Sequence, residues 1–190
     1  MLGLLMWNPM SGYDIKKLVD VGLSHFWSEN YGQIYPTLEQ LVINGLASKK
    51  SARKSGNRQR FVYTITSQGR KIFRDWIGEA TTTPIVRNEM QLKLFLCANS
   101  PSKSLRLIKQ YQAQQQTQLD EYRNSEELLR AAIRGRDDID ELNELLAISA
   151  RTPRQKKRQL NTFLMTLRHG IRVIEARLAW CEEAIAHLSE

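Results

Sequence analysis

The sequence predicts a mainly α-helical chain with one short β-hairpin, and three observations support this prediction. Apolar residues recur at helical spacing through most of the 190 residues. The clearest exception is the alternation of Phe61, Tyr63 and Ile65, which is typical of a half-buried strand. From residue 160 onward the apolar residues follow a heptad repeat, which indicates a long helix that packs along another helix. We therefore expect a small helical domain with a hairpin, followed by long helices.

The composition is typical of a soluble globular protein with a polyanionic partner. Apolar residues make up 42% and charged residues 25% of the chain, and the formal net charge is +8 with a pI of about 9.7. Residues 1–80 carry 11 Lys/Arg and 6 Asp/Glu, so much of the excess lies there. Cys97 and Cys181 lie in apolar helical patterns, and we expect reduced thiols in a cytoplasmic protein, with a structural disulfide as the alternative. The opening MLGLLMW is too short to span a membrane, so no membrane attachment is expected.

The pattern between Tyr31 and Thr66 predicts a helix, a glycine stop and a hairpin. Leu38, Leu41 and Val42 form one apolar stripe, and Gly45 is placed to end the helix. The following stretch, from Lys49 to Arg60, holds six basic residues and no acidic one. Helices expected on either side, at about residues 13–21 and from residue 67, complete the order of a winged helix-turn-helix.

A polar helix face beside a cationic hairpin favours binding to duplex DNA. Gln33 can bond an adenine edge, Thr37 can contact a thymine methyl group, and the hydroxyl of Tyr35 can reach a phosphate. The alternative is an ordinary exposed helix face. For the hairpin, the alternative is a solvated loop. The candidate DNA-binding residues of the hairpin are Lys49, Lys50, Arg53, Lys54, Asn57, Arg58 and Arg60. We expect Arg58 and Arg60 to be the best held of these.

Two long segments with periodic apolar residues predict that the second half of the chain consists mainly of long helices. We expect a winged-helix domain at 1–80, a linker at 81–86 and a helical dimerisation domain at 87–190, in which the long helices form a coiled-coil-like arm. The alternative is that the apolar seam is only an internal core. The seam of the last helix consists of Leu160, Leu164, Leu167, Ile171, Ile174, Leu178, Cys181, Ile185 and Leu188.

No pattern in the sequence predicts an enzyme. The chain has no phosphate-binding glycine loop and no nucleophile elbow. His25, His169 and His187 are not spaced as metal ligands with one another or with the cysteines. We therefore expect no catalytic activity, no metal and no cofactor.

Several sequence words resemble the PadR family of bacterial transcriptional regulators. The word GQIYPTLEQL at residues 32–41 is the most specific of these. The others are LGLL at 2–5, SGYDI at 11–15, FWS at 26–28, GL at 45–46, YTITSQGR at 63–70 and RNEMQLKLF at 87–95. The C-terminal part resembles the helical domain of the AphA-like virulence-activator branch in length and heptad character.

The resemblance implies a winged-helix homodimer that binds a pseudo-palindromic operator, usually as a repressor. It implies that Gln33, Tyr35, Pro36 and Thr37 lie on the recognition helix and that Ser11 and Tyr13 contact the DNA backbone. It also implies a small aromatic effector. The side chains of Trp7, Trp76 and Trp180 could line a site for it, and core packing is the alternative for them. Residues 135–158 match no part of the family, and the first helix is expected to be short.

These observations lead to two functional hypotheses. The first is a sequence-specific DNA-binding repressor that acts as a homodimer. The second is a helical dimeric ligand-sensing or protein-interaction module without a DNA target of its own, in which the basic face would bind an acidic protein.

Overall fold

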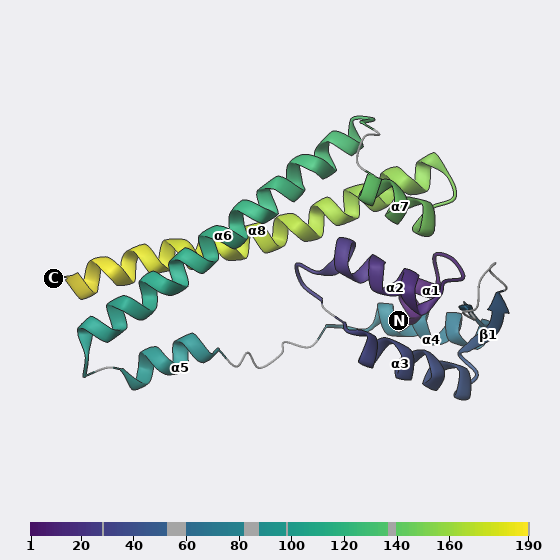
Figure 1. Cartoon of the computed structure of the whole chain (residues 1–190), viewed down its shortest axis with the longest axis horizontal. Coiled ribbons are helices and arrows are strands. Elements are labelled where there is room, and N and C mark those ends of the chain that lie inside the picture. The colour runs from purple at the N-terminus through teal and green to yellow at the C-terminus, as the bar shows by residue number, and fades with distance from the viewer. Residues whose placement is uncertain (28, 53–59, 82–87, 98, 137–139, 190) are drawn as a thin grey trace. The chain divides into compact units, whose positions relative to one another are not determined.

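The computed structural model describes all residues except 28, 53–59, 82–87, 98, 137–139 and 190 (Figure 1). The described residues form helices and one two-stranded antiparallel sheet, which confirms the expected fold class. The elements follow in this order: α1 (Leu2–Leu5), α2 (Gly12–Leu18), a π-helical turn η1 (Val19–Leu23), α3 (Tyr31–Ile43), β1 (Ala47–Ala52), β2 (Arg60–Ile65), α4 (Ser67–Gly78), α5 (Glu89–Leu96), α6 (Pro101–Ile133), α7 (Asp140–Ser149) and α8 (Pro153–Ser189).

The chain folds into two compact units, and each unit is built from two separate stretches of the sequence. The first unit comprises Met1–Thr81 and Ala132–Phe163, and the second comprises Thr82–Ala131 and Leu164–Glu190. The division expected from the sequence, with one boundary near residue 80, kept the segment around α7 with the long helices. In the structure this segment packs on the winged helix instead, because contacts distant in sequence attach it there.

Those contacts are both polar and apolar. The Asn8 amide donates to the carbonyl oxygen of Ile148 at 2.5 Å, and Lys17 forms an ion pair with Glu144. The rings of Trp7 and Phe163 lie 6.3 Å apart. Leu142, Leu145 and Leu146 of α7 are buried. The helix α7 is therefore amphipathic, and its apolar face covers η1 and α2.

In the first unit, side-chain caps begin the helices where the sequence predicts. The Ser11 hydroxyl accepts from the Asp14 amide to begin α2, and the Thr66 hydroxyl accepts from the Gly69 amide to begin α4. After α3, Gly45 adopts φ +69° and the Leu46 amide donates to the Leu41 carbonyl, which is a Schellman ending.

The hairpin pairs β1 and β2 from Ala47 opposite Ile65 to Ala52 opposite Arg60. Met10 adds an isolated bridge to Tyr63, so the start of the chain is hydrogen-bonded to the returning strand. Tyr63 and Ile65 point inward, as their alternation predicts. The core beneath the sheet consists of buried side chains from the first three helices and from Met10 between α1 and α2: Leu5, Met10, Ile15, Leu18, Ile34 and Leu38.

The helices α4 and α5 carry apolar residues at helical spacing, but these residues are exposed. Trp76 and Ile77 of α4 are each 64% exposed, although their spacing predicts an inward face. In α5, Phe95 is 80% exposed and Leu96 is 72% exposed, and none of its residues is buried. Helical spacing predicts that such residues share a face, but it does not say what covers that face.

The second unit is built on the antiparallel pairing of α6 with α8 (Figure 1). Leu119 of α6 packs among the buried seam residues Leu167, Ile171, Ile174 and Leu178, with Tyr122 and Leu129 at the edge of this cluster. Pro101 is the first residue of α6, as the Ser100-Pro101 pair predicts. The cluster thus buries four of the nine predicted seam residues within a single chain.

No helix in the described part of the chain is both long enough and apolar enough to cross a lipid bilayer.

Candidate nucleic-acid interface

The predicted base-reading residues of α3 lie on its open face. Gln33, Tyr35, Pro36 and Thr37 are all exposed, whereas Ile34 and Leu38 between them are fully buried. This separation follows from the helical period, since residues 34 and 38 are one turn apart and face the core. The structure therefore presents the four predicted recognition residues together, on one helix surface.

Two of these side chains also serve the helix itself. The side-chain oxygen Oε1 of Gln33 accepts from the Asn30 backbone amide at 3.1 Å, and the Asn30 side-chain oxygen accepts from the Gln33 backbone amide at 3.0 Å. This capping box occupies one oxygen of Gln33 and leaves its amide nitrogen free to donate. The Thr37 hydroxyl donates to the Gln33 carbonyl at 2.7 Å, which leaves the Thr37 methyl group for apolar contact. The Gln33 amide nitrogen can donate to an acceptor on a base edge, and the Thr37 methyl group can contact a thymine methyl group.

Pro36 lies inside α3 and removes one helical hydrogen bond. Its ring has no N–H to donate to the carbonyl of Gly32, four residues earlier. The sequence predicts that the helix begins close to this proline or has a distorted first turn. The structure begins the helix at Tyr31, so the proline falls in the second turn, next to the Thr37 side-chain bond.

Tyrosine side chains form a second exposed group beside this face. The rings of Tyr31 and Tyr35 stack with centroids 6.0 Å apart, and Lys16 lies 5.9 Å above the Tyr31 ring. Tyr35 also rests on the first turn of α2, where a Cβ atom at Gly12 would lie 2.6 Å from its ring. Tyr13 in the same turn is 59% exposed. Gly12 is therefore the residue that allows α2 and α3 to approach closely.

Ser11 is placed differently from its expected role. Its side chain is buried, and its hydroxyl donates to Asp14 at 2.7 Å while it accepts from the Asp14 backbone amide. The hydroxyl is thus used to cap α2. Tyr13 is accessible for the backbone contact that the resemblance implies, whereas the Ser11 side chain is not.

Arg60 at the start of β2 forms an ion pair with Asp14. Its Nη2 atom lies 2.6 Å from each carboxylate oxygen of Asp14, whose side chain is only 17% exposed. Burial alone raises the pKa of Asp14, but the hydrogen bonds from Ser11 and Arg60 outweigh burial and hold the pKa below its ordinary value. The expectation that Arg60 is well held is confirmed, and its partner is an acid of α2.

Lys49 at the start of the hairpin has a similar arrangement. Its Nζ atom lies 2.6 Å from Oε1 of Glu39 on α3, and the Tyr63 hydroxyl donates to the same oxygen at 2.8 Å. The bonds from Lys49 and Tyr63 lower the pKa of Glu39. Burial, and then the Glu39 carboxylate, raise the pKa of Tyr63. Lys49 also lies 4.1 Å from the centre of the Phe61 ring.

The described hairpin cations are therefore not equivalent. Lys50 is exposed, and none of the ion pairs found among the described residues includes it. Arg60 and Lys49 are partly neutralised by acids of the two helices, a feature that the sequence reasoning missed. The pairs join residues 46 and 10 positions apart, and no local pattern indicates the first of them. Four predicted hairpin residues lie outside the described residues: Arg53, Lys54, Asn57 and Arg58.

The predicted dimerisation seam lies largely within one chain. Six of its residues are buried in the chain's own interior: Leu160, Leu167, Ile171, Ile174, Leu178 and Cys181. Leu164, Ile185 and Leu188 are half-buried and remain partly accessible. Cys181 and Cys97 are both free thiols, and burial raises the pKa of the Cys181 thiol.

The tryptophans do not share one environment. Trp7 packs against Phe163 in the first unit, whereas Trp76 on α4 and Trp180 on α8 are 64% and 36% exposed. Core packing is therefore seen only for Trp7 among these three.

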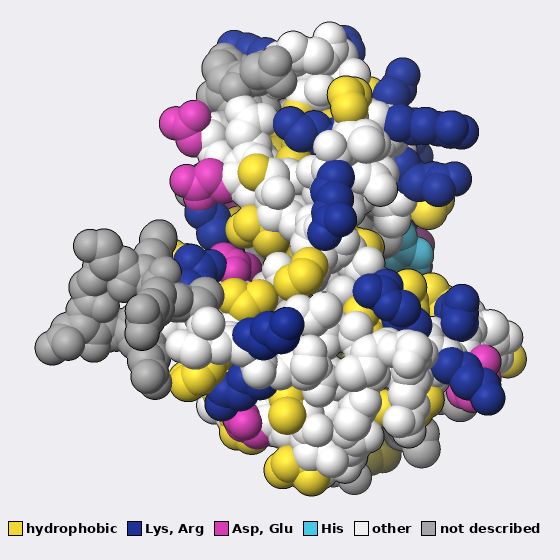
Figure 2. Space-filling view, turned by 90° about the vertical axis from the view of Figure 1, so that its right-hand side faces the viewer, with side chains coloured by type: hydrophobic (Ala, Val, Ile, Leu, Met, Phe, Trp, Pro, Cys, Tyr) yellow, Lys and Arg dark blue, Asp and Glu magenta, His cyan; other side chains and the backbone are white. Residues whose placement is uncertain are grey.

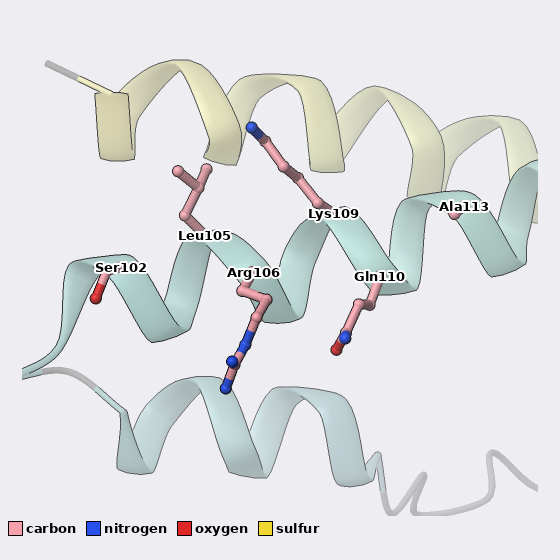
Figure 3. Close-up of a pocket in the computed structure, with 6 residues that line it drawn as sticks. All are labelled: Ser102, Leu105, Arg106, Lys109, Gln110 and Ala113. Atoms are coloured by element: carbon pink, nitrogen blue, oxygen red, sulfur yellow. The ribbon is translucent and has the colours of Figure 1, made fainter.

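A shallow groove of about 450 Å³ runs along the first turns of α6 (Figure 3). Leu105 and Lys109 point to one side of it and Arg106 to the other, towards α5. The residues that line it are Ser102, Leu105, Arg106, Lys109, Gln110 and Ala113. The groove is shallow, and its lining combines apolar surface with the charged side chains of Arg106 and Lys109. In the described ranges, no group of three His, Cys, Asp or Glu side chains is placed to hold a metal ion.

Comparison with known proteins identifies the family. Residues 1–75 match the model of the transcriptional regulator PadR-like family, and residues 86–189 match the model of the virulence activator alpha C-terminal domain. The negative transcriptional regulator PadR of Bacillus subtilis is 31% identical over 133 residues, which cover 69% of this chain and 73% of that protein. The chain belongs to the PadR-like family of transcriptional regulators.

Several solved structures share the fold of this chain. Bacillus subtilis PadR in complex with operator DNA matches with a TM-score of 0.69 and 24% identity, over 95% of this chain and 94% of that chain. The virulence activator AphA of Vibrio cholerae matches with a TM-score of 0.72 and 23% identity, over 99% and 95%. Bacillus subtilis PadR in complex with p-coumaric acid has a TM-score of 0.75 and 24% identity, over 100% and 96%. The winged-helix fold of this PadR-like chain is thereby shown.

Proposed function

We propose that this PadR-like regulator binds a pseudo-palindromic operator as a homodimer and represses transcription. The observation that carries the proposal is the open face of α3, where Gln33, Tyr35 and Thr37 lie exposed beside the cationic hairpin. The relative PadR of Bacillus subtilis is a negative transcriptional regulator, and one of its structures contains operator DNA. In this arrangement α3 would enter the major groove and the hairpin would reach the flanking backbone.

The two ion pairs would keep the hairpin at a fixed distance from α3. Arg60 holds β2 to α2 through Asp14, and Lys49 holds β1 to α3 through Glu39. Lys50 would then be the described hairpin cation that is most available to a phosphate. Arg53, Lys54, Asn57 and Arg58 remain predicted contacts from the sequence, as do Tyr13 and Pro36 on the helices.

We further propose that the homodimer is formed through the exposed apolar faces of α4 and α5. The helix α4 exposes Trp76 and Ile77, and α5 exposes Phe95 and Leu96. Exposure of such large apolar side chains to water is unfavourable in free energy. A second copy of the chain would cover such faces. The predicted seam can take part where it is accessible, at Leu164, Ile185 and Leu188.

A small aromatic effector is the third part of the proposal. The structure of PadR with p-coumaric acid shows that such a ligand binds that protein. For this chain we infer an effector of similar chemistry, and tryptophan fluorescence during a titration with phenolic acids would test it. A regulator of this family acts by binding DNA, so we also infer a cytoplasmic protein without catalytic activity.

A salt titration tests the DNA-binding proposal. The affinity for duplex DNA is measured between 50 and 200 mM salt, and each phosphate contact contributes about 0.9 to the log–log slope. We expect Lys50→Gln to lower the slope by roughly that amount. The matched control is Lys71→Gln, an exposed lysine on α4 that should leave the slope unchanged. Equal slopes for both variants would contradict the proposed contact.

A further inference from the structure

A second basic surface lies where α7 ends and α8 begins. Five exposed cations fall within eight residues: Arg151, Arg154, Lys156, Lys157 and Arg158. We call this group the α8 basic segment. Lys and Arg side chains gather over the upper part of the surface view, the part of the molecule where α7 and the start of α8 lie (Figure 2). The proposed DNA contacts of α3 and the hairpin do not use these residues.

The α8 basic segment contains no acidic residue, and its described side chains form no ion pair. Between Glu144 and Glu175 the chain contains no Asp or Glu. In the part of the chain that the structure describes, no ion pair includes Arg154, Lys156, Lys157 or Arg158. Arg151 donates from Nε to the side-chain oxygen of Asn8 at 2.5 Å, which attaches the start of the segment to the N-terminal part of the chain. Among the described residues, the positive charge of the other four side chains is therefore not compensated by an ion pair.

The local electrostatics of the helix oppose this arrangement. The first turn of a helix is the positive end of its dipole, where acidic residues are favoured and cations are not. Here Thr152 and Gln155 form the cap with neutral side chains: the Gln155 oxygen accepts from the Thr152 amide at 3.2 Å. Residues that conflict with local preferences are expected mainly at functional sites. The conflict therefore indicates a role in binding for the α8 basic segment.

The α8 basic segment lies too far from α3 to contact the DNA groove that α3 would enter. Both α3 and α7 pack on α2, and Figure 1 shows them on opposite sides of it. Arg151 and Arg154 follow directly after α7. A duplex bound by α3 therefore does not lie against the α8 basic segment, and the segment must meet a different polyanion.

The chemistry of the segment favours a nucleic-acid backbone over a protein. Protein interfaces are built around buried aromatic and apolar anchors, whereas the affinity for a phosphate backbone comes mainly from cations and needs no apolar anchor. Between Arg151 and Arg158 the only apolar residue is Pro153. We propose that the α8 basic segment binds the phosphate backbone of a second duplex, without sequence preference, so that the protein can bridge two DNA segments. The bridging role rests on the proposed function, since α3 holds the first duplex.

A bridging assay tests this proposal with matched variants. The segment variant carries Arg154→Gln, Lys156→Gln and Lys157→Gln. The control variant carries Lys103→Gln, Arg106→Gln and Lys109→Gln, and it loses the same three charges from exposed positions of α6. A duplex selected for tight binding is immobilised and loaded with protein, and the capture of a second, fluorescent duplex of unrelated sequence is measured.

We expect the wild type and the control variant to capture the second duplex equally. The segment variant should capture at least about tenfold less, because three lost phosphate contacts remove about 2.7 from the salt slope. Its affinity for the immobilised duplex should change less than about twofold, since α3 and the hairpin are intact. Capture by the segment variant equal to that of the control variant would overturn the proposal.

Two further outcomes separate this proposal from the proposed function. If no duplex is selected, binding of unrelated duplex in solution is compared between the segment variant and Lys50→Gln. A loss in the segment variant alone supports the second surface and contradicts the role of the hairpin. Binding of polyglutamate is measured in parallel. If the segment variant loses polyglutamate binding but keeps duplex binding, the surface serves an acidic protein and the DNA proposal is overturned.

Discussion

Nη2 of Arg60 lies 2.6 Å from both carboxylate oxygens of Asp14, so the returning strand of the hairpin is attached to the first turn of α2. Asp14 also accepts from the Ser11 backbone amide at 2.9 Å. One carboxylate thus joins the cap of α2 to the hairpin. It also neutralises a cation that the sequence predicts as a phosphate contact.

Asp14→Asn should therefore release Arg60 and alter DNA binding. The amide can still accept from Ser11, but it no longer neutralises the guanidinium. We expect the salt slope of binding to unrelated duplex to rise by about 0.9, and the ratio of operator to unrelated affinity to fall. The free energy of unfolding should fall by about 1–3 kcal/mol.

Asp20→Asn is the control for this prediction. It removes one acid from the same unit, where Asp20 pairs with Lys16 on the exposed surface. If both variants raise the slope equally, the effect is one of net charge and the specific role of Asp14 is wrong.

The pH dependence of stability should reflect the same groups. The pKa of Asp14 is lowered in the folded protein, so its stabilisation is present above the unfolded pKa of about 3.9 and is lost as the pH falls through the folded value. The pKa of Tyr63 is raised, so its stabilisation is present below about pH 10 and is lost as the pH rises. Urea unfolding across pH should show a flatter acid limb for Asp14→Asn and a flatter alkaline limb for Tyr63→Phe. Limbs that match the wild type would contradict these assignments.

Gly12→Ala should impair DNA binding by separating α2 from α3. The added methyl group would lie 2.6 Å from the Tyr35 ring, so the ring must move off the first turn of α2. We expect a loss of operator affinity of about tenfold, since a displaced recognition helix loses about one base contact or more. Gly78→Ala is the control, because nothing lies within 4 Å of its added methyl group. Equal operator affinity of Gly12→Ala and Gly78→Ala would show that the close contact between α2 and α3 is not needed for DNA binding.

Much of the fold could be predicted because its signals are local. The caps at Ser11, Asn30 and Thr66 and the glycine ending at Gly45 each depend on residues a few positions apart. The hairpin and the heptad helix follow from periodicity, and the exposed face of α3 follows from its apolar stripe.

The interactions between distant residues could not be predicted in this way. The pairing of Arg60 with Asp14 and the packing of α7 on α2 are set by the tertiary fold. The exposed faces of α4 and α5 show the same limit, since a helical pattern says which residues share a face but not whether the same chain covers it.

Ile174→Ala should destabilise each chain without separating two copies. Ile174 is fully buried within the cluster of α6 and α8, so truncation should cost about 2–5 kcal/mol. Met165→Ala on the same helix is the control, because Met165 is 68% exposed and should change stability by less than about 0.5 kcal/mol. Chemical unfolding and sedimentation measure the two effects. A variant that is monomeric but as stable as the wild type would instead place Ile174 between two copies.

Phe95→Ser should weaken the homodimer without unfolding the chain. The side chain is 80% exposed in a single chain, so its loss leaves no cavity there, whereas a covering partner would lose a buried ring. We expect the dimer dissociation constant to rise by at least about tenfold in sedimentation equilibrium, with an unchanged melting temperature at a concentration where both proteins are monomers. An unchanged dissociation constant would show that α5 lies outside the interface.

The most direct test of the central claim is the selection of binding sites from a pool of random duplexes. If two copies of α3 read successive major grooves, the recovered sequences should share a two-fold symmetric pattern with half-sites about 34 Å apart. The Gln33→Ala variant should recover a pattern that is relaxed at one position in each half-site. A recovered pool without a shared sequence, bound no more tightly than unrelated DNA, would contradict the account.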